Sequence, residues 1–176
     1  MFSTKSQLKK RTPENGTDRE NFLSLLVDEY LNSNSFDAKC QVLANLANFA
    51  YDPINYRFIR DVGVLDIFMY VLKNESNNKL LSFACAGVCN LCIDPLNVTY
   101  ILQHLELKYI RNLLHSEDSE ILANTITTLI YLFSEQTRSE INIPEVLQVI
   151  HRLKDSEDKI ISNLAKVFIK DVCNEE

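Results

Sequence analysis

The sequence predicts an all-α solenoid of about four repeats. Its 176 residues include only 3 Gly and 4 Pro, fewer than globular chains ordinarily use. Apolar residues follow the i, i+3, i+4, i+7 spacing of amphipathic helices rather than the alternation of strands. Similar segments also return about every 40 residues, which is the mark of a helical repeat array.

The repeat is clearest where the first two long helices are predicted to end. Residues 48–55, Asn-Phe-Ala-Tyr-Asp-Pro-Ile-Asn, return at 90–97 as Asn-Leu-Cys-Ile-Asp-Pro-Leu-Asn. The same alignment places Thr128 and Lys166 in the column of Asn48 and Asn90. It also yields apolar columns that we expect to be buried. These columns are Val42, Ala84, Leu122 and Ile160; Leu46, Val88, Ile126 and Leu164; and Phe49, Leu91, Leu129 and Val167.

Shorter helices are predicted between the long ones. Asp52 and Asp94 occupy N-cap positions, each followed by a proline that suits the first helical position. A turn over 61–65 and a polar loop over 73–78 separate the next helices. Units of two or three helices and about 40–47 residues are typical of armadillo and HEAT arrays. We therefore predict an armadillo-type right-handed α-solenoid, with a flexible tail over 1–18 and a single domain over 19–174.

Composition narrows the functional classes. The net charge of −6 opposes a polyphosphate partner, so we expect no direct nucleic-acid binding, or only weak binding. No signal sequence or membrane span is evident. Four of the five cysteines fall in apolar helical segments, which indicates reduced buried thiols. We expect a soluble intracellular protein, and the basic cluster at 9–11 is either an import signal or an ordinary solvated tail.

The residues also resemble a known family. Segments 41–53, 87–92 and 126–129 closely resemble a small family of single-domain armadillo-repeat proteins, and the resemblance spans about residues 21–173. Members of that family bind an RNA-recognition-motif protein, RNA-binding motif protein 48, within the minor spliceosome that removes U12-type introns. The resemblance implies a nuclear, non-enzymatic, monomeric subunit of a hetero-complex that contacts spliceosomal proteins. His104-Leu105 departs from the preceding repeat, which has Gly63-Val64 at that point.

A cysteine motif offers a competing interpretation. Cys85, Cys89 and Cys92 have the spacing by which radical S-adenosylmethionine enzymes hold an iron–sulfur cluster. In the repeat alignment, however, all three occupy columns of apolar residues, so we interpret them as core residues. The three histidines lack metal-site spacing, and no glycine-rich phosphate loop is present. We therefore expect no catalytic residue, metal or cofactor.

The predicted site is a polar stripe on the long helices. Residues spaced by four, three and four fall on one side of a helix, away from the apolar columns. By the resemblance, an asparagine at positions 48 and 90 binds the main chain of an extended partner, since an amide is both donor and acceptor. Lysines at one end and aspartates at the other favour a partner of mixed charge. The alternatives are a merely solvated face, an interface on the short helices near Tyr56 and Arg60, or an adaptor of an unrelated transport or signalling pathway. The candidate protein-binding residues are Gln41, Asn45, Asn48, Asp52, Asn90, Asp94, Thr128, Asn163 and Lys166.

Overall fold

The computed structural model describes residues 2–4, 6–7, 10 and 17–173. Throughout these residues the regular structure is helical, as predicted. The chain divides into two compact units, the first ending at Asn97 and the second beginning at Val98. Most of the predicted tail over 1–18, including Lys9 and Arg11 of the basic cluster, lies outside the described residues.

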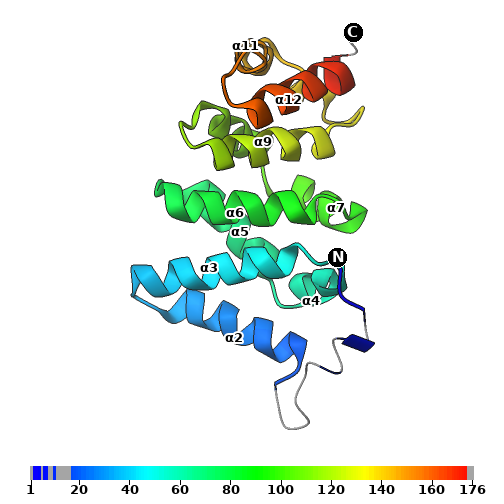
Figure 1. The fold of residues 1–176 in the computed structure, drawn as a ribbon. Helices are drawn as coiled ribbons and strands as arrows, with labels where there is room; N and C mark the ends of the chain where they lie inside the picture. The colour runs from blue at the N-terminus through cyan, green and yellow to red at the C-terminus, as the bar shows by residue number, and fades with distance from the viewer. Residues whose placement is uncertain (1, 5, 8–9, 11–16, 174–176) are drawn as a thin grey trace. The chain divides into compact units, whose positions relative to one another are not determined.

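The first unit is a stack of helices. Helix α3 packs between α2 and α6, and α5 packs against α6 (Figure 1). Asp18, Ser35 and Asn77 cap the three long helices by accepting hydrogen bonds from backbone N–H groups of their first turns. The elements are α2 (Arg19–Asn32), α3 (Phe36–Ala50), η1 (Pro53–Asn55), α4 (Tyr56–Asp61), α5 (Val64–Asn74) and α6 (Asn78–Leu91).

The predicted turn before α5 is confirmed. Gly63 has a φ of 75° in the left-handed region, which a residue with a side chain adopts only at a cost. It brings the chain directly into α5.

The second unit is organised around α9, which packs against α8, η2 and α12, while α11 also packs against α12. Asp118 and Asp158 cap α9 and α12 in the same way as the caps of the first unit. Helix α7 (Pro95–His104) crosses the boundary between the units. The other elements are α8 (Leu107–Arg111), η2 (Asn112–His115), α9 (Ser119–Leu132), α10 (Arg138–Ile141), α11 (Pro144–Leu153), α12 (Lys159–Phe168) and the π-helical turn η3 (Ile169–Cys173).

The predicted apolar columns form the core of the first three repeats. Leu46, Val88 and Ile126 are buried, and Phe49 is half-buried at the side of α2. In α12 the prediction is wrong, because Ile160 is 66% and Val167 is 44% exposed. That helix buries Ile161, Ala165 and Phe168 instead. Because α12 packs against α9, α11 and η3, its buried positions follow these neighbours and not the columns of the first three repeats.

None of the described helices combines the length and the apolar character that crossing a bilayer requires.

Candidate protein-binding face

The nine candidate residues differ widely in exposure. Gln41 and Asn48 on α3 are exposed, as are Asn163 and Lys166 on α12. Asn45, Asp52, Asn90 and Asp94 are half-buried. Thr128 is only 1% exposed. The first unit therefore holds six of the candidates, and the exposed ones among them lie on α3.

The polar stripe does not continue onto α9. Thr128 is buried together with Thr125, because α9 is packed by α8 and η2 as well as by α12. The Thr128 hydroxyl has no hydrogen-bond partner within the described residues. On α6, Gly87 stands where α3 has Asn45, and Gly87 is buried against the ring of Phe68. Spacing alone therefore misplaced Thr128, because it does not reveal that α6 and α9 are packed on more than one side.

The Asp-Pro-x-Asn segments join consecutive helices. Asp52 Oδ1 accepts a hydrogen bond from the Ile54 N–H, and Asp94 Oδ1 accepts bonds from the N–H groups of Leu96 and Asn97. The asparagine that ends each segment binds back to the long helix before it. Asn55 Nδ2 donates to the carbonyl of Phe49 at 2.8 Å, and Asn97 Nδ2 donates to that of Leu91 at 3.1 Å.

These bonds satisfy backbone groups that a helix end leaves without partners. The repeated segment thus has a structural purpose that requires no ligand.

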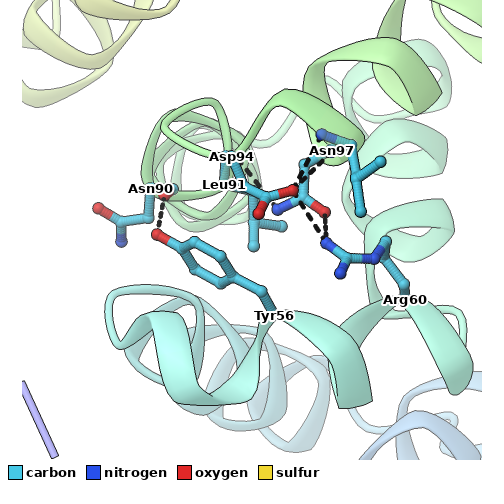
Figure 2. A network of polar contacts seen from close by, with 7 residues as sticks. Tyr56, Arg60, Asn90, Leu91, Asp94 and Asn97 are labelled. Atoms are coloured by element: carbon cyan, nitrogen blue, oxygen red, sulfur yellow. Dashed lines mark hydrogen bonds and ion pairs between the residues drawn. The ribbon is translucent and has the colours of Figure 1, made fainter.

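Asp94 is also paired inside the fold. Arg60 Nη1 donates to Asp94 Oδ1 at 3.1 Å and to Asn97 Oδ1 at 2.7 Å (Figure 2). Tyr56, on the same short helix, is buried and donates its hydroxyl to the Asn90 carbonyl at 2.9 Å. These contacts bind α4 to the end of α6. The main role of these three side chains, Asp94, Tyr56 and Arg60, is therefore to stabilise the first unit.

The two asparagines expected to act alike differ in the structure. Asn90 is half-buried, and its Nδ2 donates to the carbonyl of Ala47 on α3 at 3.2 Å. Asn48 is exposed at the surface of α3. We expected both positions to lie on the polar side of the long helices, away from the apolar columns, but Asn90 is half-buried and its amide bridges α6 and α3.

An exposed apolar column accompanies the asparagine column. Tyr51, Ile93 and Tyr131 follow three residues after Asn48, Asn90 and Thr128, and they are 59%, 56% and 46% exposed. Residues three apart lie on the same side of a helix, so Tyr51 lies beside Asn48. This exposed column was present in the sequence as a fourth column of large apolar residues, in addition to the three columns that were expected to be buried.

A second feature that the sequence did not reveal is a contact from the N-terminal residues. The Ser3 N–H donates to Asp52 Oδ2 at 3.0 Å, and the Phe2 ring lies 5.6 Å from the Tyr51 ring, centroid to centroid. Burial on its own would raise the pKa of Asp52. Hydrogen bonds from Ser3 and Ile54, together with the charge of Arg19, outweigh burial and lower that pKa from its ordinary value of 3.8.

The cysteine motif lies in the core. Cys85, Cys89 and Cys92 are buried, as is Cys40. Burial, followed by the neighbouring Cys89 and Cys85, raises the pKa of the Cys92 thiol well above its ordinary value. In the described residues, no three His, Cys, Asp or Glu side chains are grouped so as to hold a metal ion. The three thiols pack as small apolar side chains.

Comparisons with solved structures define the class of protein. An engineered protein aligns with 86% of this chain at a TM-score of 0.73 and 20% identity. A computationally designed armadillo repeat protein for modular peptide recognition aligns with 85% of this chain, with a TM-score of 0.73 and 15% sequence identity. A designed armadillo repeat protein in complex with the peptide (KR)4 aligns with 85% of this chain, with a TM-score of 0.72 and 13% sequence identity. This chain spans 62%, 63% and 64% of their respective lengths. The fold is that of the armadillo repeat proteins, a class of protein-binding scaffolds.

A sequence relative identifies the family within that class. The mouse armadillo repeat-containing protein 7 is 43% identical over 158 residues, which cover 89% of this chain and 79% of the relative. The chain therefore belongs to the armadillo repeat-containing protein 7 family. No family model matches it.

Proposed function

We propose that this chain is a non-enzymatic adaptor of the nuclear pre-mRNA splicing machinery. In this proposal it is a subunit of the minor spliceosome that acts on U12-type introns, and it binds an RNA-recognition-motif protein similar to RNA-binding motif protein 48. The family resemblance supports the pathway and the partner. The fold supports the mode of action, because armadillo repeat proteins act as protein-binding scaffolds.

The proposed binding site rests on two exposed residues three positions apart, Asn48 on the last turn of α3 and Tyr51 at its C-cap. Both side chains are exposed on the same side of the helix. The Asn48 amide is able to donate and to accept a hydrogen bond with a partner main chain. Tyr51 adds a large, rigid contact surface with a polar tip, a residue type enriched at protein interfaces. We call these two residues the α3 surface.

Charge supports a protein partner over a nucleic acid. The chain carries 24 acidic and 18 basic residues, and this excess of negative charge repels phosphates. A partner with basic residues is attracted instead. A designed armadillo repeat protein of the same fold is in complex with the basic peptide (KR)4, which supports a partner segment that carries basic residues.

A pull-down from nuclear extract tests the pathway. The intact chain is immobilised beside a Tyr51→Ala variant, with Tyr70→Ala as a matched control, because Tyr70 on α5 is similarly exposed. The proposal predicts that the intact chain and Tyr70→Ala recover minor-spliceosome proteins, including the RNA-recognition-motif protein, while Tyr51→Ala recovers less. Recovery of transport or signalling proteins without splicing factors would instead assign the adaptor to another pathway.

Imaging of the tagged chain in cells tests the nuclear assignment separately. A signal confined to the cytoplasm would contradict it.

A further inference from the structure

The N-terminal residues of the chain lie against the same turn of α3 that carries the α3 surface. Phe2 and Tyr51 form a tilted ring pair, with an interplanar angle of 48°. Rings at such a separation and inclination attract each other through their quadrupoles. One residue later, the Ser3 N–H donates to Asp52 Oδ2. Two adjacent residues of the segment thus contact two adjacent residues, Tyr51, which is the C-cap of α3, and Asp52, which is the N-cap of η1.

The contact has the chemistry of a bound extended peptide. Residues 2–4 have no helical structure, and the Ser3 N–H donates outside its own segment, to Asp52, whereas the Thr4 N–H donates to Gln7 Oε1 at 2.9 Å. The Ser3 bond uses a main-chain donor and a carboxylate acceptor, a charge-assisted pair that is stronger than a bond between neutral groups. The Phe2 contact uses an aromatic side chain. In such a contact the main-chain N–H of Ser3 contributes affinity, and the Phe2 side chain contributes selectivity for an aromatic residue.

The corresponding position in the next repeat shows what this contact replaces. At Asp94, the aspartate accepts a bond from Arg60 of the preceding repeat. Asp52 accepts the Ser3 N–H at Oδ2 and the Ile54 N–H at Oδ1, and the charge of Arg19 also acts on this carboxylate. The Asp52 carboxylate therefore has one oxygen directed to the fold and one directed to the segment.

We propose that Tyr51 and Asp52 form a docking site for an extended segment with an aromatic side chain followed by a main-chain N–H, and that Phe2-Ser3 of the same chain occupies it as an intramolecular ligand. This proposal rests on the proposed function, since Tyr51 belongs to the α3 surface. It adds that the partner has to displace Phe2-Ser3 before it engages Tyr51. A tethered segment competes at high effective concentration, even when its own contacts are few.

The experiment uses the full-length chain and a defined probe, the fluorescently labelled and N-acetylated peptide Met-Phe-Ser-Thr-Lys-Ser-Gln-Leu-Lys-Lys of residues 1–10. The test variant is Phe2→Ala with Ser3→Pro, which removes both the ring and the amide hydrogen that Asp52 accepts. The matched control is Phe36→Ala, which removes a similarly exposed aromatic at the other end of α3. Fluorescence anisotropy measures binding of the peptide to each protein.

The double variant is expected to bind the peptide about threefold to tenfold more tightly than the intact chain. That factor corresponds to a site occupied by its own segment for about two-thirds to nine-tenths of the time. Phe36→Ala should bind like the intact chain. Adding Tyr51→Ala to the double variant should abolish the gain.

Equal affinities for the intact chain and the double variant would overturn the proposal. So would a double variant that binds no peptide and unfolds at a markedly lower temperature, since Phe2-Ser3 would then be a structural cap of the first repeat. The peptide assay contains no splicing factor, so its failure is distinguishable from failure of the proposed function, which the pull-down measures. Conversely, a pull-down without splicing factors leaves the peptide result standing.

Discussion

Phe68 on α5 lies directly against Gly87 on α6. A Cβ built at Gly87 would lie 2.4 Å from Phe68 Cζ and 2.8 Å from Phe68 Cδ2, closer than real Cβ contacts. Phe68 is fully buried. The absence of a Cβ at Gly87 therefore lets α6 lie close against the Phe68 ring of α5, which explains why a glycine is tolerated inside a long helix.

The first prediction concerns this contact. Gly87→Ala should raise the free energy of unfolding by about 1 kcal/mol through helix propensity and lower it by about 1–3 kcal/mol through overpacking. The overpacking is the larger effect, so the net change is a loss of stability. Urea unfolding should show net destabilisation. Gly87→Ala with Phe68→Leu should recover part of the loss, because the ring that meets the added methyl is gone. An unchanged or raised midpoint for Gly87→Ala alone would refute the close approach.

The second prediction compares the two asparagines of the Asp-Pro-x-Asn segments. Asn97 is buried, donates to the Leu91 carbonyl and accepts from Arg60. Asn55 donates to the Phe49 carbonyl, while its Oδ1 has no hydrogen-bond partner among the described residues. Asn97→Ala should cost about 1–3 kcal/mol of unfolding free energy, and Asn55→Ala should cost less. Thermal unfolding of both variants checks the order, and a larger loss for Asn55→Ala would contradict the network.

The third prediction concerns the cysteines. Buried neutral thiols are poor nucleophiles, so Cys40, Cys85, Cys89 and Cys92 should react slowly with an aromatic disulfide reagent at pH 8. Cys173 is half-exposed and should react first. The remaining four thiols should react rapidly only after denaturant has unfolded the chain. Rapid labelling of Cys85, Cys89 and Cys92 in the native protein would instead indicate an accessible thiol site.

The fourth prediction concerns Asp52 and pH. Its pKa in the folded chain is lowered from 3.8, so the stabilisation that comes with the shift is complete above that ordinary value. It is lost as the pH falls through the folded pKa. A carbon NMR titration should place the Asp52 midpoint below 3.8. Ser3→Pro should move the midpoint upward, and an unmoved midpoint would show that Ser3 does not contact the carboxylate.

Much of the fold could be predicted from periodicity, while the candidate site could be predicted only in part. The columns of Leu46 and Leu91 predicted buried helix faces, because burial of an apolar face depends on local spacing. Thr128 was misplaced because burial on a second face of a helix depends on which other helices pack there. Asp94 looked available for a partner, and only the three-dimensional structure shows Arg60 against it.

Contacts between segments that are distant in the sequence were the hardest features to predict. Ser3 and Asp52 are 49 residues apart, and no pattern in the sequence links them. The Tyr51 column was visible as repeated large apolar residues, but its exposure depends on how α3 packs. Long-range pairing of this kind requires the structure.

The α3 surface is tested most directly by calorimetric titration of the full-length chain with a purified RNA-recognition-motif protein similar to RNA-binding motif protein 48. The variants are Asn48→Ala and Tyr51→Ala, with Asn34→Ala as the control, since Asn34 is an exposed asparagine in the loop before α3. Our account predicts that Asn48→Ala weakens binding by about threefold to tenfold, that Tyr51→Ala weakens it at least as much, and that all three variants unfold near the temperature of the intact chain. Unchanged affinity of both folded α3 variants would place the interface elsewhere and contradict the account.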